Sequence, residues 1–318
     1  IWDSLGGYFV LLVTKGNPLA FFAWQGLGSI LITVIAGYYA WKPIGREFLC
    51  FRLSKSQFRG LGNFGALSML LSALMAGIAF SDRWFIGGVI SVAAVATYSL
   101  LMQPIMLVSN LVGTVSTQLT ARFSELIALG EEEALGSIFT KGTQVGILVL
   151  LFPVAALLTA PAELYHLWLR NSELATEIGS LAPVAMISTA LMSQTTLVFQ
   201  AEIAKGRMQF YVLMTAARLI LILLSWNFLL SHYGIWGALC AGLVMTFAEC
   251  LLVNWFILRR QIPRAGAKWL IDLLIFPAVI LFPAVMGARF MVDSLGINGS
   301  GHVGMAVKLT VAFGIVTI

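Results

Sequence analysis

Residues 70–101 read LLSALMAGIAFSDRWFIGGVISVAAVATYSLL, two apolar runs on either side of a short charged segment. A membrane-spanning helix needs about 20 mostly apolar residues, and the chain beyond each end of this stretch is apolar enough to supply them. The segment SDRWFIGG, residues 81–88, sets Asp82 and Arg83 side by side between the runs. Because charges are costly in hydrocarbon, this segment is predicted to be the hairpin turn between two spans, with its charges at the membrane edge.

The composition of the whole chain indicates the same environment. Of 318 residues, 59% are hydrophobic and only 10% are charged, and the mean hydropathy is +0.93. A soluble domain carries about 25% charged residues, so the chain is predicted to be an all-α integral membrane protein, a multi-helix bundle of the transporter kind. The net charge of +5 does not call for a nucleic-acid partner, because membrane proteins concentrate Lys and Arg in cytoplasmic loops.

Long apolar windows, most of them free of charge, predict ten spans, of which the first and last are incomplete. A turn-like break, SHYGIWG at residues 231–237, separates two of them. The expected spans are residues 3–14, 16–41, 60–81, 84–121, 142–162, 178–201, 208–230, 235–258, 267–290 and 303–318.

The distribution of basic residues predicts the orientation. If the segment 42–60 is cytoplasmic, alternation places 122–141, 203–208 and 259–268 on the same side. These four segments hold most of the 19 Lys and Arg residues, a bias typical of the cytoplasmic face. The acidic run 131–133 is predicted to be a solvated helix start. On the opposite side, Tyr165 and Trp168 of the segment PAELYHLWL, residues 161–169, are expected to anchor in the outer interface.

Two ionisable residues fall inside predicted spans. Arg218 lies about 15 Å from the cytoplasmic end of its helix, and Glu249 lies about 13–14 Å from the cytoplasmic end of the next helix. The two helices are expected to be antiparallel neighbours, so the charges fall at matching depth and are predicted to pair. The pair is either a fixed interhelical salt bridge or part of a polar cavity, and a pair that exchanges partners would fit both interpretations.

Polar residues also line one face of the long helix at 91–121. Ser99, Gln103, Asn110, Thr114 and Thr117 fall within about 60° of one another at 100° per residue. Such a stripe indicates either a water-facing wall or hydrogen bonds between helices, and five aligned positions favour the wall. A less regular polar cluster around Gln194 occupies the helix after Pro183. Its members are Ser188, Thr189, Ser193, Gln194, Thr195, Thr196 and Gln200.

Several classes of function have no support in the sequence. The three cysteines, Cys50, Cys240 and Cys250, lack CxxC spacing, so neither a disulfide framework nor a zinc site is indicated, and buried free thiols are expected. The three histidines are scattered, so no metal site is predicted. The chain has no nucleophile elbow, metalloprotease motif or phosphate-binding loop. We therefore expect a protein that is not an enzyme and that carries no cofactor.

The order of several short motifs resembles a known family. The stretch SDRWFIGGVISVAAVATYSLLMQPI, residues 81–105, resembles the start of the second lobe of oligosaccharide-lipid flippases. These belong to the polysaccharide-transporter branch of the multidrug/oligosaccharidyl-lipid/polysaccharide exporter superfamily. The segments LTARFSELIALGEEEAL, YHLWLRNSELATEIGSLAPVAMI, AEIAKGRMQF and SHYGIWGALCAGL look like later landmarks. Two departures stand out: Thr97 replaces a glycine of the family pattern, and Ala121 replaces a proline.

The resemblance implies a domain organisation. The family has fourteen helices, in two six-helix lobes plus two more. Residues 1–41 would then be the end of the first lobe, 42–60 a cytoplasmic linker, 61–260 the second lobe, and 261–318 the two C-terminal helices. On this scheme about four helices precede residue 1, so the chain is expected to be a fragment.

The resemblance also implies a function. The expected activity is movement of an undecaprenyl-linked oligosaccharide from the inner to the outer leaflet of the bacterial cytoplasmic membrane. Transport would proceed by alternating access and would be driven by a gradient of H⁺ or Na⁺. From their positions, Arg218 would meet the pyrophosphate or acidic sugars, Glu249 would pair with it or take up a proton, and Arg83 and Arg122 would lie near the two mouths. Gln103, Asn110, Thr114 and Gln194 complete the candidate path.

Other functions are also compatible with the sequence. A multidrug exporter or a lipid II flippase of the same superfamily is the main alternative, although balanced mid-membrane charges favour an anionic substrate. A membrane-embedded glycosyltransferase would require a catalytic carboxylate or a large outer loop, and the outer loops are short. For Asp82 and Arg83, a solvated turn without a role in transport is the alternative to a lobe mouth.

Overall fold

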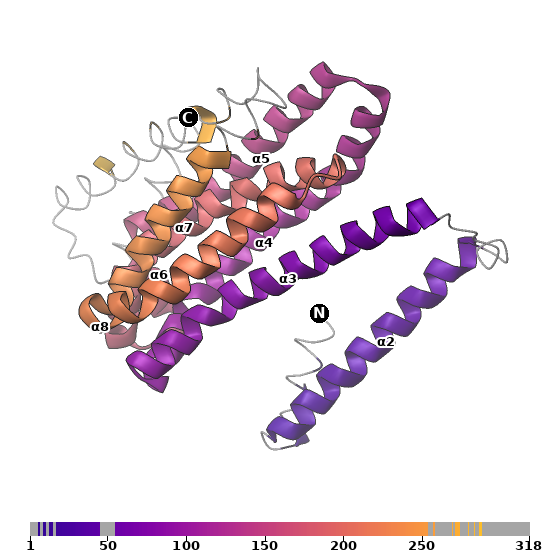
Figure 1. Ribbon diagram of the computed structural model, residues 1–318. Coiled ribbons are helices and arrows are strands. Elements are labelled where there is room, and N and C mark those ends of the chain that lie inside the picture. The colour runs from indigo at the N-terminus through magenta and orange to yellow at the C-terminus, as the bar shows by residue number, and fades with distance from the viewer. Residues whose placement is uncertain are drawn as a thin grey trace. The chain divides into compact units, whose positions relative to one another are not determined.

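The computed structural model of the chain is built from helices (Figure 1). It describes residues 17–44 and 55–253, and also residues 6, 9, 10, 13, 14, 257, 269, 271–273, 279, 283, 286 and 287. Within these residues none is in a strand, and six helices are long and apolar enough to cross a membrane. The predicted all-α membrane fold is confirmed. The spans predicted at 3–14, 267–290 and 303–318 lie largely or wholly outside the described residues.

The chain divides into two compact units, Ile1–Gly62 and Asn63–Ile318. The first unit contains α2, Pro18–Ile44, and the beginning of α3, Lys55–Val89. The side-chain oxygen of Asn17 accepts a hydrogen bond from the Leu19 N–H at 3.0 Å, which satisfies one of the free donors at the start of α2. The segment 42–60 was predicted to be a linker. The end of α2 extends into its first residues, and α3 begins within it.

The predicted hairpin turn at residues 81–88 is wrong. α3 continues through this segment to Val89, and the chain reverses in the two residues before α4, Val92–Leu129. The Ser91 side chain caps α4 by accepting a hydrogen bond from the backbone N–H three residues later at 3.1 Å. The helix persists at Asp82 because the carboxylate accepts two hydrogen bonds from neighbouring helices and so does not need solvent.

The segment 122–141, predicted to be a cytoplasmic loop, is helical except for a two-residue turn between α4 and α5, Glu132–Thr159. Gly130 in this turn has φ 72° and ψ 18°, and its N–H bonds to carbonyls of the last turn of α4, as in a left-handed C-cap. Residues 131–133 are exposed at the start of α5, where negative charge is favourable, so the predicted solvated helix start is confirmed. At 1.5 Å per residue α4 is about 57 Å long, so this hairpin extends beyond the hydrocarbon.

A short helix, α6, Pro161–Leu169, leads into α7, Ser172–Ala204. The prediction that both aromatic residues of α6 anchor in the membrane interface is wrong for Tyr165. Its side chain is only 1% exposed, and its hydroxyl donates to the Leu101 carbonyl of α4 at 2.7 Å. Trp168 is 46% exposed and remains available to the interface. The Leu101 carbonyl is next to that of Leu100, which the missing N–H of Pro104 leaves without its helical partner.

The predicted break in residues 231–237 is confirmed. The last element, α8, Gln209–Val253, is interrupted at Gly234, which has φ 58° and ψ −155°. Only glycine readily adopts this conformation, because other residues place a Cβ against the backbone. The break divides α8 into two segments, so it accounts for the two spans that were predicted there.

The second unit is organised around α7, which packs against α4, α5, α6 and α8. Two clusters of buried apolar side chains flank it. One includes Leu101, Ile178 and Trp226, and the other includes Phe123, Phe139 and Leu197. Each cluster joins residues from distant parts of the chain, so apolar packing between helices holds the helices of this unit together.

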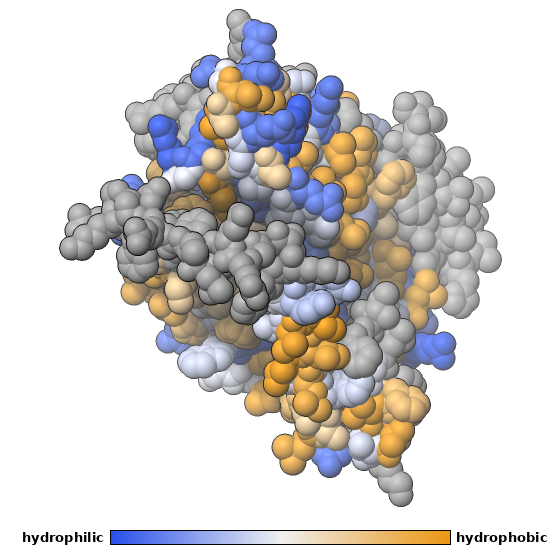
Figure 2. Space-filling model, turned by 90° about the vertical axis from the view of Figure 1, so that its right-hand side faces the viewer, coloured by the Kyte–Doolittle hydropathy of each residue, from blue (hydrophilic) through white to orange (hydrophobic). Residues whose placement is uncertain are grey.

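Many large apolar side chains are exposed on the described helices, and Figure 2 shows patches of them on one face. On α8 alone, Leu213, Leu224 and Val244 are 66%, 75% and 67% exposed. In water such a surface would be an aggregation site, whereas in a bilayer it faces lipid of matching polarity. The polar groups that lie within the spans are therefore the positions that require a separate explanation.

Candidate functional site

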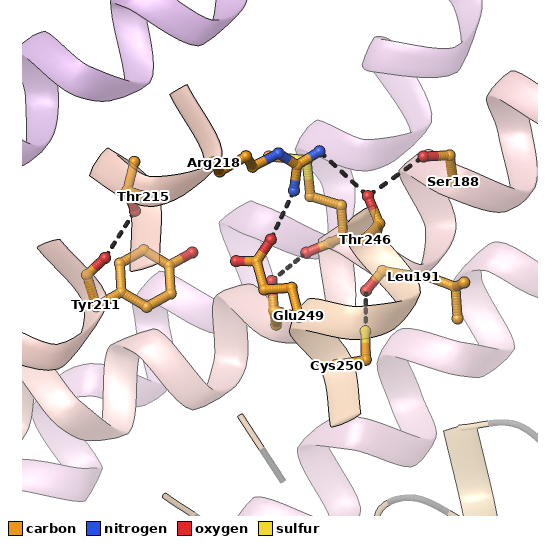
Figure 3. A network of polar contacts seen from close by, with 10 residues as sticks. Ser188, Leu191, Tyr211, Thr215, Arg218, Thr246, Glu249 and Cys250 are labelled. Atoms are coloured by element: carbon orange, nitrogen blue, oxygen red, sulfur yellow. Dashed lines mark hydrogen bonds and ion pairs between the residues drawn. The ribbon is translucent and has the colours of Figure 1, made fainter. Parts of the chain in front are cut away.

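The charged pair predicted inside the membrane is formed. Arg218 Nη1 lies 2.6 Å from Glu249 Oε2, and the two side chains are only 15% and 12% exposed (Figure 3). A straight helix would separate these residues by about 46 Å, so the break at Gly234 is what brings them together. Both lie about 22–24 Å along the helix from that break, which explains why they meet at one depth.

The pair belongs to a larger polar network. Arg218 Nη2 donates to Thr246 Oγ1 at 3.1 Å, and Thr246 Oγ1 lies 3.4 Å from Ser188 Oγ of α7 (Figure 3). Thr246 is fully buried. The network therefore joins both segments of α8 to α7. Thr246 was not singled out in the sequence, although it precedes Glu249 by about one helical turn and so lies on the same face.

One donor of this network has no acceptor. Arg218 Nε is buried and makes no hydrogen bond to any residue that the structure describes. An unpartnered buried donor costs about 1–3 kcal/mol, and charged groups cost more. The guanidinium therefore retains binding capacity in the membrane-spanning region.

Two other residues of α8 border the pair. The Tyr211 ring stacks on Phe199 of α7 with centroids 4.4 Å apart, and its hydroxyl end points toward Glu249 (Figure 3). Cys250, the neighbour of Glu249, is buried, and its thiol lies 3.9 Å from the Leu191 carbonyl. By contrast Cys240 is exposed, so the expectation of buried thiols is wrong there, while Cys50 lies outside the described residues.

The polar stripe of α4 lies on an exposed face. Gln103, Asn110, Thr114 and Thr117 are exposed, and Ser99 is partly buried. Thr114 Oγ1 donates to the Asn110 carbonyl at 2.9 Å, so this hydroxyl is satisfied within its own helix. No hydrogen bond from these residues to another helix occurs in the described part of the chain, which favours the wall over the interhelical alternative.

The polar cluster of α7 serves mainly to join helices. Ser193 and Ser109 of α4 lie 2.7 Å apart through their hydroxyls, and Thr120 donates to Gln200 at 2.8 Å. Gln194 is 2% exposed, and its amide packs against Gly146 of α5, where a Cβ would approach Nε2 to 3.0 Å. Gln194 is therefore buried between helices and is not placed with the exposed residues of α4.

An apolar pocket of about 510 Å³ adjoins Gln194 between α5, α7 and α8. Leu150, Val154, Ile187 and Phe247 are among its lining residues, and Gln194 is the polar member of the set. The amide Nε2 of Gln194 has no hydrogen-bond partner among the described residues. Across those same residues, no group of three or more His, Cys, Asp or Glu side chains is arranged to hold a metal ion.

The two outer candidates are separate from the central network. Arg83 is exposed near the end of α3. Arg122 pairs with Glu125 at 2.6 Å in α4, and both side chains are about half exposed, at 50% and 54%. Such an exposed pair contributes little to stability, and it leaves Arg122 accessible.

A second charged site was missed in the sequence. Asp82 accepts a hydrogen bond from the Tyr98 hydroxyl at 2.7 Å through Oδ2, and another from Trp226 Nε1 at 3.0 Å through Oδ1. The carboxylate thus joins α3 to α4 and α8. Tyr98 was noted only as part of a family-like dipeptide, and nothing in the sequence around Trp226 indicates that its ring nitrogen reaches α3.

Comparison with known proteins adds no relative. No family model, no curated protein and no solved structure matches the chain. The fold and the site thus define the class of protein: an all-α, multi-pass membrane protein with an ion-paired polar network inside its spans.

Proposed function

We propose that this protein is a flippase of the bacterial cytoplasmic membrane. It moves an undecaprenyl-linked oligosaccharide from the inner to the outer leaflet by alternating access, and an ion gradient drives the cycle. The motif order around SDRWFIGG and its later landmarks supports this proposal from the sequence side. The observation that carries it is the Arg218–Glu249 pair with its unpartnered Arg218 Nε.

An arginine within the spans suits the head group of such a substrate. A guanidinium binds phosphate oxygens through a planar fork of N–H donors, and it stays charged in an apolar environment. Carrying an unused donor there has a cost that a purely structural pair would avoid. A substrate pyrophosphate would supply the missing acceptor to Arg218.

The exposed polar face of α4 suits the sugar part of the substrate. Gln103 and Asn110 offer both amide donors and carbonyl acceptors, and Thr114 adds a hydroxyl. A hydrated sugar needs such groups along its path, whereas the isoprenoid tail can stay in the bilayer. Arg83 and Arg122, near opposite ends of the spans, would attract the anionic head group at the two mouths.

A leaflet assay tests the proposal. The intact protein is reconstituted in vesicles with a lipid-linked oligosaccharide that carries a dithionite-quenchable fluorophore on the sugar, and the quenchable fraction is followed over time. Arg218→Ala should slow flipping at least about tenfold, the loss expected when a charged hydrogen bond is removed. Lys141→Ala, which removes an exposed cation from α5, should leave the rate unchanged.

The same vesicles separate the alternatives. If Arg218→Ala flips at the wild-type rate, Arg218 has no part in transport. If the wild type extrudes lipophilic cations and does not flip the labelled oligosaccharide, the protein is a multidrug exporter. Flipping of labelled lipid II in place of the oligosaccharide would identify the other member of the superfamily.

A further inference from the structure

The Arg218–Glu249 pair is electrically neutral as a unit. Arg218 Nη1 is held by Glu249 Oε2 at 2.6 Å, and Nη2 is held by Thr246 at 3.1 Å. A site with no net charge attracts a diphosphate weakly, and an ionised carboxylate beside the guanidinium repels it. The resting arrangement therefore conflicts with anion binding, even though one donor is available.

The unused donor shows where an anion would bind. Nε and Nη2 lie along one edge of the planar guanidinium, which is the edge that forms a two-pronged contact with phosphate. On Arg218 the Nε end of this edge has no acceptor among the described residues, and the Nη2 end is occupied by the neutral Thr246 hydroxyl. Because a phosphate oxygen is a stronger acceptor than a hydroxyl, it could take both positions. The remaining obstacle is the negative charge of Glu249.

We propose that Glu249 and the anionic head group compete for Arg218, so that a proton and the anion bind at this site together. This inference rests on the proposed function and specifies its coupling. The Glu249 carboxylate takes one proton from water and becomes a neutral acid. The pair then carries a net charge of +1, and Arg218 turns its free edge to the diphosphate. When the proton leaves, Glu249 reclaims Arg218 and expels the anion.

Glu249 is the carboxylate in direct contact with Arg218, and the other groups around it are uncharged or more distant. From α8 it faces Arg218, the Tyr211 phenol and the Cys250 thiol. α7 adds the uncharged Ser188 hydroxyl, while from α3 the Asp82 carboxylate acts on Arg218 at longer range. Asp82 is held by two donors of its own, so it does not compete for Arg218 by direct contact.

Binding of a short isoprenyl diphosphate to the intact protein tests the inference. Farnesyl diphosphate is titrated into the wild type and Glu249→Gln, in detergent, between pH 5.5 and 8. At pH 8, Glu249→Gln should bind about tenfold more tightly or better, because the competing charge is gone. The advantage of Glu249→Gln over the wild type should decrease as the pH falls. Taking the ratio of the two affinities cancels the titration of the diphosphate itself.

Two further variants complete the test. Glu249→Asp keeps a carboxylate, so its affinity should retain the wild-type dependence on pH, and Arg218→Ala should lose binding at every pH. A thermal unfolding curve for each variant establishes that it is folded. If folded Glu249→Gln binds no more tightly than the wild type at pH 8, the competition does not exist.

The outcome also distinguishes this inference from the proposed function. Wild-type flipping together with equal diphosphate affinities of wild type and Glu249→Gln would overturn the competition and leave the flippase in place. The predicted affinity pattern without any flipping of the oligosaccharide would support the competition and overturn the flippase.

Discussion

Asp82 illustrates how a carboxylate can remain inside a membrane helix. Burying an unpaired charge costs many kcal/mol, and the cost falls when hydrogen bonds satisfy the group. Here one carboxylate oxygen accepts from Tyr98 and the other from Trp226. Both donors are neutral, and the charge is on the carboxylate that accepts, so each hydrogen bond is charge-assisted and about twice as strong as a neutral one.

Removal of this carboxylate should destabilise the bundle. Asp82→Ala leaves two donors without an acceptor, so the free energy of unfolding should fall by about 2–4 kcal/mol. Asp82→Asn keeps one carbonyl oxygen and should lose less. Unfolding in a detergent titration measures both. Arg83→Ala, which removes the exposed neighbouring charge, should change the value by no more than about 0.5 kcal/mol. Equal stability of Asp82→Ala and Arg83→Ala would show that the hydrogen bonds do not contribute.

The elements are shaped by a few backbone positions. Pro104 lacks the N–H that would reach the Leu100 carbonyl, and Tyr165 donates to the adjacent carbonyl of Leu101. This hydrogen bond joins α6 to α4 at the turn where Pro104 removes a backbone hydrogen bond. Gly234 interrupts α8. The chain reverses direction there, and this reversal brings Arg218 and Glu249 together.

Two glycines of α8 allow the energetic cost of the positive φ at Gly234 to be measured separately from side-chain contacts. Gly234→Ala meets no neighbouring atom within 4 Å, but its φ of 58° is unfavourable for alanine, so stability should fall by about 1–3 kcal/mol. Gly242→Ala also meets no atom within 4 Å, and it lies in regular helix, so it should stabilise the protein by about 0.5–1 kcal/mol. Thermal unfolding of the two variants provides the comparison. A stabilising Gly234→Ala would contradict the observed break.

For the second unit, Asn63–Ile318, the turns imply a definite membrane topology. The connection at residues 90–91, the α6–α7 connection at 170–171 and the break at Gly234 are expected on the outer side. The turn at 130–131 and the connection at 205–208 are expected on the cytoplasmic side, as the basic residues indicate.

Labelling of single cysteines checks this arrangement. In a background without the three native cysteines, Ser91→Cys and Asn171→Cys should react with an impermeant maleimide added outside intact cells. Glu132→Cys and Arg207→Cys should react only after the membrane is opened. All four positions are exposed, so access is decided by the side of the membrane. Labelling of Glu132→Cys in intact cells would reverse the orientation.

Much of the fold follows from properties that residues carry individually. The hydropathy of a segment is the sum over its own residues and does not depend on the helices packed against it, so the spanning segments could be predicted. The Arg218–Glu249 pair could be predicted as well, because a break in one apolar run sets two charges at matching distances from it. The turn at 81–88 could not, because it was inferred from charge alone, and Asp82 has partners 16 and 144 positions away.

The sequence by itself determined that this is an all-α membrane protein, where α8 breaks, and which two charges meet at depth. The tertiary structure alone decided that α3 continues through SDRWFIGG, that Tyr165 is buried, and that Gln194 lies between helices while the stripe of α4 faces outward. The reason is physical: hydrophobicity selects the segments that enter the membrane, whereas the rotation of each helix against its neighbours selects the partner of each polar group.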